Sequence, residues 1–191
     1  FDLGGGTFDV SIIEIADGTF NVLATGGDST LGGVDFDIRL ADHLMDRFET
    51  DEDLSVRDES VVVQRVLNAA ELAKIDLSLL QHAEVRLPFV THRRGKPVDM
   101  ALHVSRQILN QLTEDLIERC ARTVDEVLAH AGLKHSDIDE ILLAGGQTRM
   151  PAIQARLEKQ FGRSPKKGVN PDEVVAQGAA LLARSLAGAA D

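Results

Sequence analysis

The sequence predicts a mixed α/β protein, and three observations carry that prediction. Residues 1–27 alternate apolar and polar side chains between turn signals, as the strands of an antiparallel meander do. Three later stretches, 34–48, 58–78 and 105–131, repeat apolar residues at helical spacing. The run 140–144 is almost wholly apolar, which is typical of a strand covered on both faces, and it leads through two glycines into another helix.

The first nine residues, FDLGGGTFD, form the strongest candidate site. Asp2 precedes Gly4, Gly5 and Gly6, and Thr7 follows them, between two strand-like segments. Glycine N–H groups can point at one spot without Cβ interference, so the loop predicts an anion site, with phosphate the expected anion. Asp2 stands at its edge, where a carboxylate can hold a metal-bound water. An ordinary glycine hairpin is the alternative explanation of these nine residues.

Two further turn signals follow in the first third of the chain. Asp17-Gly18 predicts the hairpin turn of the meander. Gly32-Gly33 begins the helix 34–48 and is a second place where backbone could approach a phosphate. A plain helix entry explains that pair better when it is taken alone.

The acidic segment 49–57 predicts a solvated loop and a change of subdomain. In the helix 58–78 that follows, Glu71, Lys74 and Ser78 fall at i, i+3 and i+7, on one face of adjoining turns. A carboxylate, an ammonium and a hydroxyl in this arrangement can bind a ribose or a base edge. An exposed ion pair beside a serine is the alternative.

The middle of the chain predicts a hairpin and then one long helix. Residues 83–90 and 98–104 alternate in polarity around the turn 93–96. Ser105 is the expected cap of a helix that runs to Gly132. Cys120 lies within this helix and is interpreted as a packed small residue.

The segment GGQTRMP is the second strong candidate site. Gly145 and Gly146 follow the apolar run 140–144, and Pro151 suits the first turn of the next helix. Strand, glycine pair and helix start form the general geometry of a phosphate crevice at the carboxyl end of a sheet. A tight strand-to-helix connection is the alternative. Further on, residues 170–173 read as the cap and first turn of the last helix, in a capping-box arrangement.

Composition excludes several classes of function. The net charge of -11 argues against nucleic acid as the main partner. One cysteine allows no internal disulfide, which fits a reducing cytoplasm. No apolar run approaches the ~20 residues of a membrane span, no signal peptide is seen, and the histidines lack metal-ligand spacing. The chain begins inside a strand-like motif without Met, so we expect a fragment of a longer protein.

Five motifs together resemble the seventy-kilodalton heat-shock (DnaK-like) chaperone family, in its order and spacing and over essentially all 191 residues. They are DLGGGTFD, LGGVDFD, ELAKIDLS, GGQTRMP and NPDEVVAQGAA. The resemblance implies the second lobe of an actin-like, ribonuclease H-like ATPase domain. Its base subdomain would comprise 1–48 and 113–187, its inserted helix–β-hairpin–helix subdomain 49–112, and a tail 188–191 would lead towards an interdomain linker.

The resemblance also implies ATP or ADP with Mg²⁺ as cofactors. Asp2 and Thr7 match catalytic positions, and Asp2 would hold the metal through water. The matched nucleotide contacts are Gly4, Gly5, Gly6, Thr7, Gly33, Glu71, Lys74, Ser78, Gly145, Gly146, Gln147, Arg149 and Asp172. Three departures stand out: Val34 replaces the usual acidic residue, Gln147 a common Ser, and Ile75 an Arg that some members place over the adenine.

The function expected from this resemblance is that of an ATP-driven protein-folding chaperone of the stress response. The expected partners are the first lobe, the substrate-binding domain, a nucleotide exchange factor on the inserted subdomain and a J-domain cochaperone, with neither nucleic acid nor membrane. We expect the chain alone not to hydrolyse ATP. Two alternatives remain: a non-enzymatic interaction module, which Val34 motivates, and a sugar kinase or actin-like filament protein of the same fold, against which the Glu71-Lys74-Ser78 face argues.

Overall fold

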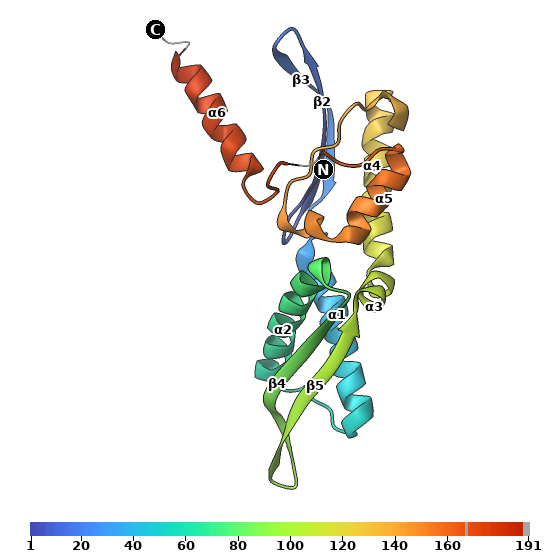
Figure 1. Cartoon of the computed structure of the whole chain (residues 1–191), viewed down its shortest axis with the longest axis vertical. Helices are drawn as coiled ribbons and strands as arrows, with labels where there is room; N and C mark the ends of the chain where they lie inside the picture. Colours follow the sequence, from blue (N-terminus) through green and yellow to red (C-terminus); the bar gives the residue numbers. More distant parts are fainter. Residues whose placement is uncertain (167, 189–191) are drawn as a thin grey trace. The chain divides into compact units, whose positions relative to one another are not determined.

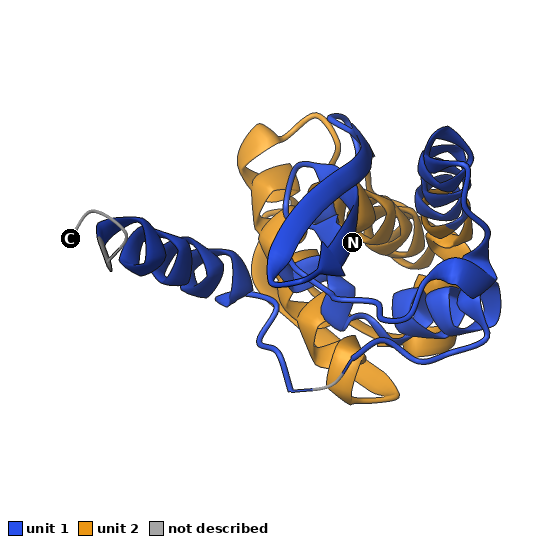
Figure 2. Cartoon of the chain, turned by 90° about the horizontal axis from the view of Figure 1, so that it is seen from above, with its two compact units in different colours: residues 1–33, 118–191 blue, residues 34–117 orange. Residues whose placement is uncertain are grey.

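The computed structural model describes residues 1–166 and 168–188 (Figure 1). The chain divides into two compact units (Figure 2). Unit 1 combines Phe1–Gly33 with the residues from Glu118 onward, and unit 2, Val34–Ile117, is inserted between them. These boundaries differ from the expected subdomain limits at 48 and 113. The family subdomains therefore stay a prediction, since compactness alone defines the two units.

Unit 1 begins with the predicted antiparallel meander. Its strands, in the order β1-β2-β3, are β1 (Asp2–Leu3), β2 (Phe8–Ala16) and β3 (Thr19–Asp28). Asp17 and Gly18 both take left-handed backbone angles, with φ of 51° and 74°, which is the geometry that a two-residue hairpin requires. Leu3 and Phe8 are fully buried, so the base of the meander lies in the core of unit 1.

The rest of unit 1 consists of helical segments that follow the meander in sequence. They are the second part of α4 (Glu114–Ala131), η1 (His135–Asp137), η2 (Gly146–Arg149), α5 (Pro151–Phe161) and α6 (Val174–Gly188). The α4 helix packs on β3, because a Cβ at Gly26 would lie 2.5 Å from a methyl carbon of Val127. Arg156 of α5 donates two hydrogen bonds to Glu118 of α4, at 2.6 and 3.0 Å. Pro151 occupies the first turn of α5, as predicted.

Unit 2 contains the predicted helix–β-hairpin–helix arrangement. Its elements are α1 (Gly33–Glu52), which starts at the unit boundary, α2 (Ser60–Leu79), β4 (His82–Arg93), β5 (Lys96–Ser105), α3 (Arg106–Leu112) and the start of α4. The β4 and β5 strands pair antiparallel around Arg94 and Gly95, whose φ angles are 52° and 78°. Val66, Ala70 and Leu77 of α2 are fully buried, and α2 packs on β4. Both units together confirm the mixed α/β class.

Two predictions of secondary structure are wrong: the strand at 140–144 and the uninterrupted helix from Ser105 to Gly132. Residues 140–144 form no strand: only a single parallel bridge joins Ala144 to Asp2. Leu142 is 48% exposed, so the run is not covered on both faces as its composition suggested. The helix predicted from Ser105 to Gly132 is broken at Thr113, where the Thr113 hydroxyl bonds the Leu109 carbonyl at 2.8 Å and φ is -119°. The caps at its two ends are confirmed, since Ser105 accepts from the Ile108 amide and Gly132 is left-handed.

Only the second part of the segment 49–57 is a loop: residues 53–57 lie outside the helices and most of them are exposed. The α1 helix continues to Glu52, and Val56 is buried. The Glu49 carboxylate accepts from the Ser55 hydroxyl at 2.9 Å and from the Val56 amide at 3.3 Å, while Arg57 bonds carboxylates along α1. Hydrogen bonds to Glu49 and the ion pairs of Arg57 with acidic side chains of α1 therefore hold this segment in place.

The last helix begins later than predicted. Residues 171–173 form a turn, and α6 starts at Val174. Asn170 still acts as a local cap, since its side-chain oxygen accepts from the Asp172 amide at 3.2 Å. Glu173 accepts from Gln177 instead of closing a capping box. Of the expected tail 188–191, Gly188 is the last residue of α6, and the remaining residues lie outside those that the structure describes. Among the helices that the structure describes, none has the length and apolar character needed to cross a membrane.

Candidate nucleotide site

The loop between β1 and β2 is open on the side of its glycines. The Gly4 amide donates to the Thr7 carbonyl at 3.1 Å and closes the turn, which leaves Gly5, Gly6 and Thr7 exposed. A Cβ at Gly5 or Gly6 would meet nothing within 4 Å, and neither residue has a positive φ. Neither packing nor backbone conformation within the chain therefore requires glycine at these two positions.

The second glycine loop lies directly beside the first. The Leu3 amide donates to the Ala144 carbonyl, and the Ala144 amide to the Phe1 carbonyl, both at 2.9 Å. Gly145 follows with φ of 82°, and a Cβ there would lie 2.3 Å from the Leu3 carbonyl oxygen and 2.7 Å from Asp2 Oδ1. Only glycine fits this contact, which brings Asp2 and the Gly145-Gly146 pair together.

The glycine pair at the start of α1 reaches the same loop. The Gly33 amide donates to the Gly4 carbonyl at 2.9 Å. A Cβ at Gly32 would lie 2.5 Å from both the Gly5 carbonyl oxygen and the Gly6 amide nitrogen. Backbone from three distant parts of unit 1 therefore meets around one turn.

Arg149 and Asp172, both predicted site residues, form an ion pair beside this second loop. The Arg149 guanidinium donates to Asp172 Oδ2 at 2.6 and 3.2 Å and to Asn170 Oδ1 at 2.8 Å. About half of each charged side chain stays exposed, 53% for Arg149 and 52% for Asp172. The Gly145 amide donates to the Pro171 carbonyl at 2.9 Å, so the segment 170–172 supports the loop.

Sequence reasoning missed two of the residues that shape this loop, and the structure adds a contact for a third. Thr148 is buried, and its hydroxyl bonds the Gly145 carbonyl at 2.7 Å. Asn170 was assigned only as a helix cap, although it also holds Arg149. Gln147 was expected at the nucleotide, yet its side chain is buried and its amide donates to the Met150 sulfur at 3.6 Å.

The three α2 residues predicted to contact adenosine lie in unit 2. Glu71 is exposed and Ser78 is half-buried, with its hydroxyl bonded to the Lys74 carbonyl. Lys74 is buried and pairs with Asp37 of α1 at 2.9 Å, an acidic partner that the sequence did not reveal. Burial raises the pKa of Asp37 and Glu71 adds to that effect, while Lys74 opposes it. The departure residues Val34 and Ile75 are both exposed.

Asp2 is the carboxylate expected to serve a metal ion at this loop. The described residues hold no group of three or more His, Cys, Asp or Glu side chains placed to bind a metal. Mg²⁺ keeps several of its waters and takes one or two carboxylates together with phosphate oxygens. Asp2 at the edge of the loop fits that mode of binding, through water.

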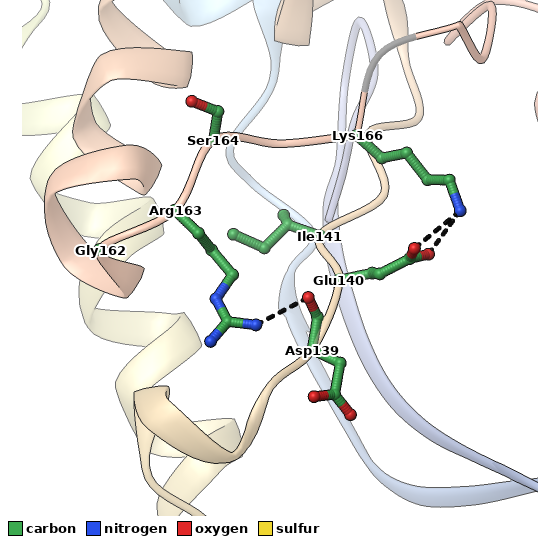
Figure 3. Close-up of a pocket in the computed structure, with 7 residues that line it drawn as sticks. All are labelled: Asp139, Glu140, Ile141, Gly162, Arg163, Ser164 and Lys166. Atoms are coloured by element: carbon green, nitrogen blue, oxygen red, sulfur yellow. Dashed lines mark hydrogen bonds and ion pairs between the residues drawn. The ribbon is translucent and has the colours of Figure 1, made fainter.

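A separate surface hollow in unit 1 encloses about 460 Å³ (Figure 3). It is lined by Asp139, Glu140, Ile141, Gly162, Arg163, Ser164 and Lys166. Arg163 donates to the Asp139 carbonyl at 2.7 Å, and Lys166 pairs with Glu140 at 2.7 Å. Both cations are thus satisfied within the chain, and no predicted site residue lines the hollow.

Comparison with known proteins identifies the family. The family model described as Hsp70 protein matches residues 1–191. The chain belongs to the Hsp70 family. Among its relatives, the chaperone protein DnaK of Psychrobacter cryohalolentis is 48% identical over 192 residues, which cover 98% of this chain and 30% of the relative. The chaperone protein dnaK of Cyanidioschyzon merolae is 48% identical over 188 residues, covering 98% and 31%.

These findings confirm the resemblance drawn from the five motifs. The chain spans just under a third of the length of these Hsp70 relatives. Hsp70 and DnaK proteins bind ATP or ADP, and as chaperones they work with client proteins and co-chaperones. The individual contacts assigned to residues of this chain stay predictions.

Proposed function

We propose that this chain is the second lobe of the nucleotide-binding domain of an ATP-dependent Hsp70 chaperone. The observation that carries the proposal is the contact of Gly145 with Leu3 and Asp2, because it joins two glycine loops at one place. Such loops offer backbone N–H groups to an anion. The chain has a net charge of -11 and Asp172 neutralises Arg149, so oriented N–H groups would supply the local positive potential.

The phosphates would lie against Gly4, Gly5, Gly6 and Thr7, with Gly33 beneath them. The empty space at the Cβ positions of Gly5 and Gly6 supports this, since a ligand can approach the backbone there. Mg²⁺, when bound, neutralises phosphate charge, and Asp2 would orient its water. Thr7 would bond a phosphate oxygen through its exposed hydroxyl. Such catalysis acts by positioning and by stabilising charge, and it also needs the first lobe.

The adenosine contacts rest on family positions. We assign Glu71, Lys74 and Ser78 to the sugar and base, and Gly145, Gly146, Gln147, Arg149 and Asp172 to the adenosine and phosphate loop. The Arg149–Asp172 pair supports its assignment, because half-exposed charged groups remain open to a ligand. The expected setting is the cytoplasm and the stress response. An exchange factor on residues 49–112, a J-domain cochaperone and a substrate-binding domain are the expected partners.

Calorimetric titration of the whole protein with Mg-ADP tests the proposal. We expect Thr7→Ala to weaken binding by roughly tenfold, because a hydrogen bond to a charged phosphate oxygen is lost. Arg163→Ala, which changes the separate hollow of unit 1, should leave the affinity within about twofold. Wild-type protein that fails to bind millimolar nucleotide would contradict the proposal.

That last outcome would favour the second candidate, a non-enzymatic interaction module. Val34 supports this candidate, since an exposed apolar side chain stands where the family resemblance implies an acidic one near the metal. The open glycines argue against it, because a lobe without a ligand gains nothing from glycine at positions 5 and 6.

A further inference from the structure

The turn that leads from β3 into the Gly32-Gly33 pair is held by its own aspartate. Asp28 Oδ1 accepts from the Thr30 amide at 3.0 Å and from the Thr30 hydroxyl at 2.9 Å. The Leu31 amide donates to the Asp28 carbonyl at 3.3 Å. This is an Asx-type turn, in which one side chain fixes the backbone two residues ahead.

A cation from α4 completes the turn. Arg119 Nε lies 2.5 Å from Asp28 Oδ2, and Arg119 Nη2 donates to the Thr30 hydroxyl at 2.8 Å. The Asp28 side chain is only 17% exposed. Burial would raise the pKa of Asp28, but the Thr30 bonds and the Arg119 charge outweigh it and hold that pKa below its ordinary value. The planar Arg119 guanidinium thus bonds the side chains of both Asp28 and Thr30.

The same helix is anchored a short way along β3. Val127 of α4 packs where Gly26 has no side chain, which fixes α4 against the strand that carries Asp28. Arg119 therefore extends from a helix that packs on the strand carrying Asp28, and its own side chain is 40% exposed.

The residues that follow the Asp28 turn contact the first glycine loop directly. Leu31 is fully buried, and Gly32 touches the backbone of Gly5 and Gly6. The Gly33 amide bonds the Gly4 carbonyl. A shift of the turn at Asp28 would consequently move the backbone against which the first glycine loop rests.

We propose that Arg119 is a positioning residue for the phosphate loop, acting through Asp28 and Thr30 on the Gly32-Gly33 backbone. This inference rests on the proposed function, because positioning matters for nucleotide only if the loop binds it. In this proposal Arg119 acts through Asp28 and Thr30 and not by contact with the nucleotide.

The test compares two arginines of equal kind in unit 1. In the whole protein, Arg119→Met should weaken Mg-ADP binding about tenfold, because a displaced loop backbone loses a hydrogen bond to a charged phosphate oxygen. Arg156→Met removes the similar bidentate pair with Glu118 and should leave affinity within about twofold, because that pair contacts none of the loop residues. Arg119→Lys keeps the charge beside Asp28 but not the fork, so it should fall between wild type and Arg119→Met.

A second variant and a spectroscopic measurement without nucleotide extend the test. If Arg119→Met does not fold, Thr30→Val, at an exposed position, removes the bridging hydroxyl and should give a smaller loss of affinity. In nucleotide-free protein with ¹⁵N-labelled glycine, the Gly4, Gly5, Gly6 and Gly33 amide resonances should shift in Arg119→Met and not in Arg156→Met.

These readouts separate the two proposals. Wild-type protein without nucleotide affinity would defeat the proposed function, and the glycine resonances would then judge the inference on their own. Unshifted resonances, wild-type affinity in Arg119→Met, or equal losses in both arginine variants would each overturn it.

Discussion

The reason why glycine is needed differs between positions of the candidate site. At Gly32 and Gly145 the chain itself leaves no room for a Cβ, whereas at Gly5 and Gly6 it leaves open space. Gly145 is doubly constrained, since its φ of 82° also disfavours any residue with a side chain. A substitution at Gly145 therefore tests folding, while one at Gly5 or Gly6 tests the ligand.

We predict that Gly145→Ala destabilises unit 1 by about 3 kcal/mol, from the left-handed backbone and the clash with the Leu3 carbonyl together. Gly162→Ala is the matched control: its φ is 68°, but a Cβ there meets nothing within 4 Å. It should cost only about 1 kcal/mol. Urea unfolding followed by circular dichroism measures both, and equal costs for the two variants would show that the close contact at Gly145 is absent.

The buried pair of Lys74 and Asp37 gives a second prediction at this scale. Lys74→Met leaves the Asp37 carboxylate buried beside Glu71, so we expect a loss of about 3 kcal/mol at neutral pH. Arg47→Met removes an exposed i,i+4 pair with Asp51, joined at 3.7 Å, and should cost less than about 0.5 kcal/mol. Replacing both buried partners, by Asp37→Leu and Lys74→Met, should recover most of the loss.

The pH dependence of this effect follows from the sign of the Asp37 shift. When the pKa of a carboxyl is raised in the folded state, the folded state holds the proton more tightly than the unfolded state does. Stability therefore falls as pH rises from the unfolded-state pKa towards the folded-state pKa. The cost of Lys74→Met should therefore shrink at mildly acidic pH, where Asp37 becomes neutral. Thermal unfolding at the two pH values checks this, and a cost that grew on acidification would contradict it.

At the scale of elements, local signals were predictable and pairings across the chain were not. The hairpin turn at Asp17-Gly18 and the cap at Ser105 depend on neighbouring residues, so the sequence was sufficient for both. The run 140–144 reads as a buried strand from composition, but its pairing depends on partners elsewhere in the chain, and Leu142 is exposed. The pairs Lys74–Asp37 and Arg119–Asp28 likewise join distant segments and left no local signal.

The segment after α1 shows how charged side chains can fix the conformation of a loop. Arg57 donates to Asp42 at 3.1 Å and to Glu49 at 3.4 Å, and it also bonds Asp46. Burial would raise the pKa of Glu49, but bonds from Ser55 and Val56 and the Arg57 charge hold it below its ordinary value. The ionised Glu49 carboxylate stabilises the fold fully at neutral pH, and this stabilisation is lost as pH falls through its lowered pKa.

We therefore predict that Arg57→Met loosens residues 53–59 at neutral pH. Hydrogen exchange of the Val56 amide should accelerate by roughly tenfold, because its carboxylate acceptor loses the cation that fixes it. Arg47→Met again serves as the control on α1 and should leave this exchange unchanged. The difference between the Arg57 variant and wild type should fade at acidic pH, and its persistence there would argue against an electrostatic cause.

At the scale of the whole molecule, covalent continuity links the two units through helices. The chain passes from unit 1 into unit 2 at the start of α1 and returns within α4. The chain corresponds to about 30% of the length of the DnaK relative from Psychrobacter cryohalolentis. Under the proposed function, the remaining catalytic groups belong to a first lobe outside these 191 residues. In unit 1, Asp2 and Thr7 could position a phosphate and a metal-bound water, but phosphoryl transfer also requires groups that stabilise the developing charge.

We accordingly predict that the isolated chain hydrolyses no ATP, whereas the whole protein hydrolyses it slowly. Asp2→Asn in the whole protein should lower the rate by at least about tenfold, because a carboxylate that orients metal-bound water is lost. Phosphate release measured on highly purified preparations checks both statements. The isolated Asp2→Asn chain is the control for contaminating ATPases, since it should release phosphate at the same background rate as the isolated wild-type chain. Turnover by the isolated chain that disappears in this variant would mean that 191 residues suffice for catalysis, and the assignment as one lobe of a two-lobe enzyme would be wrong.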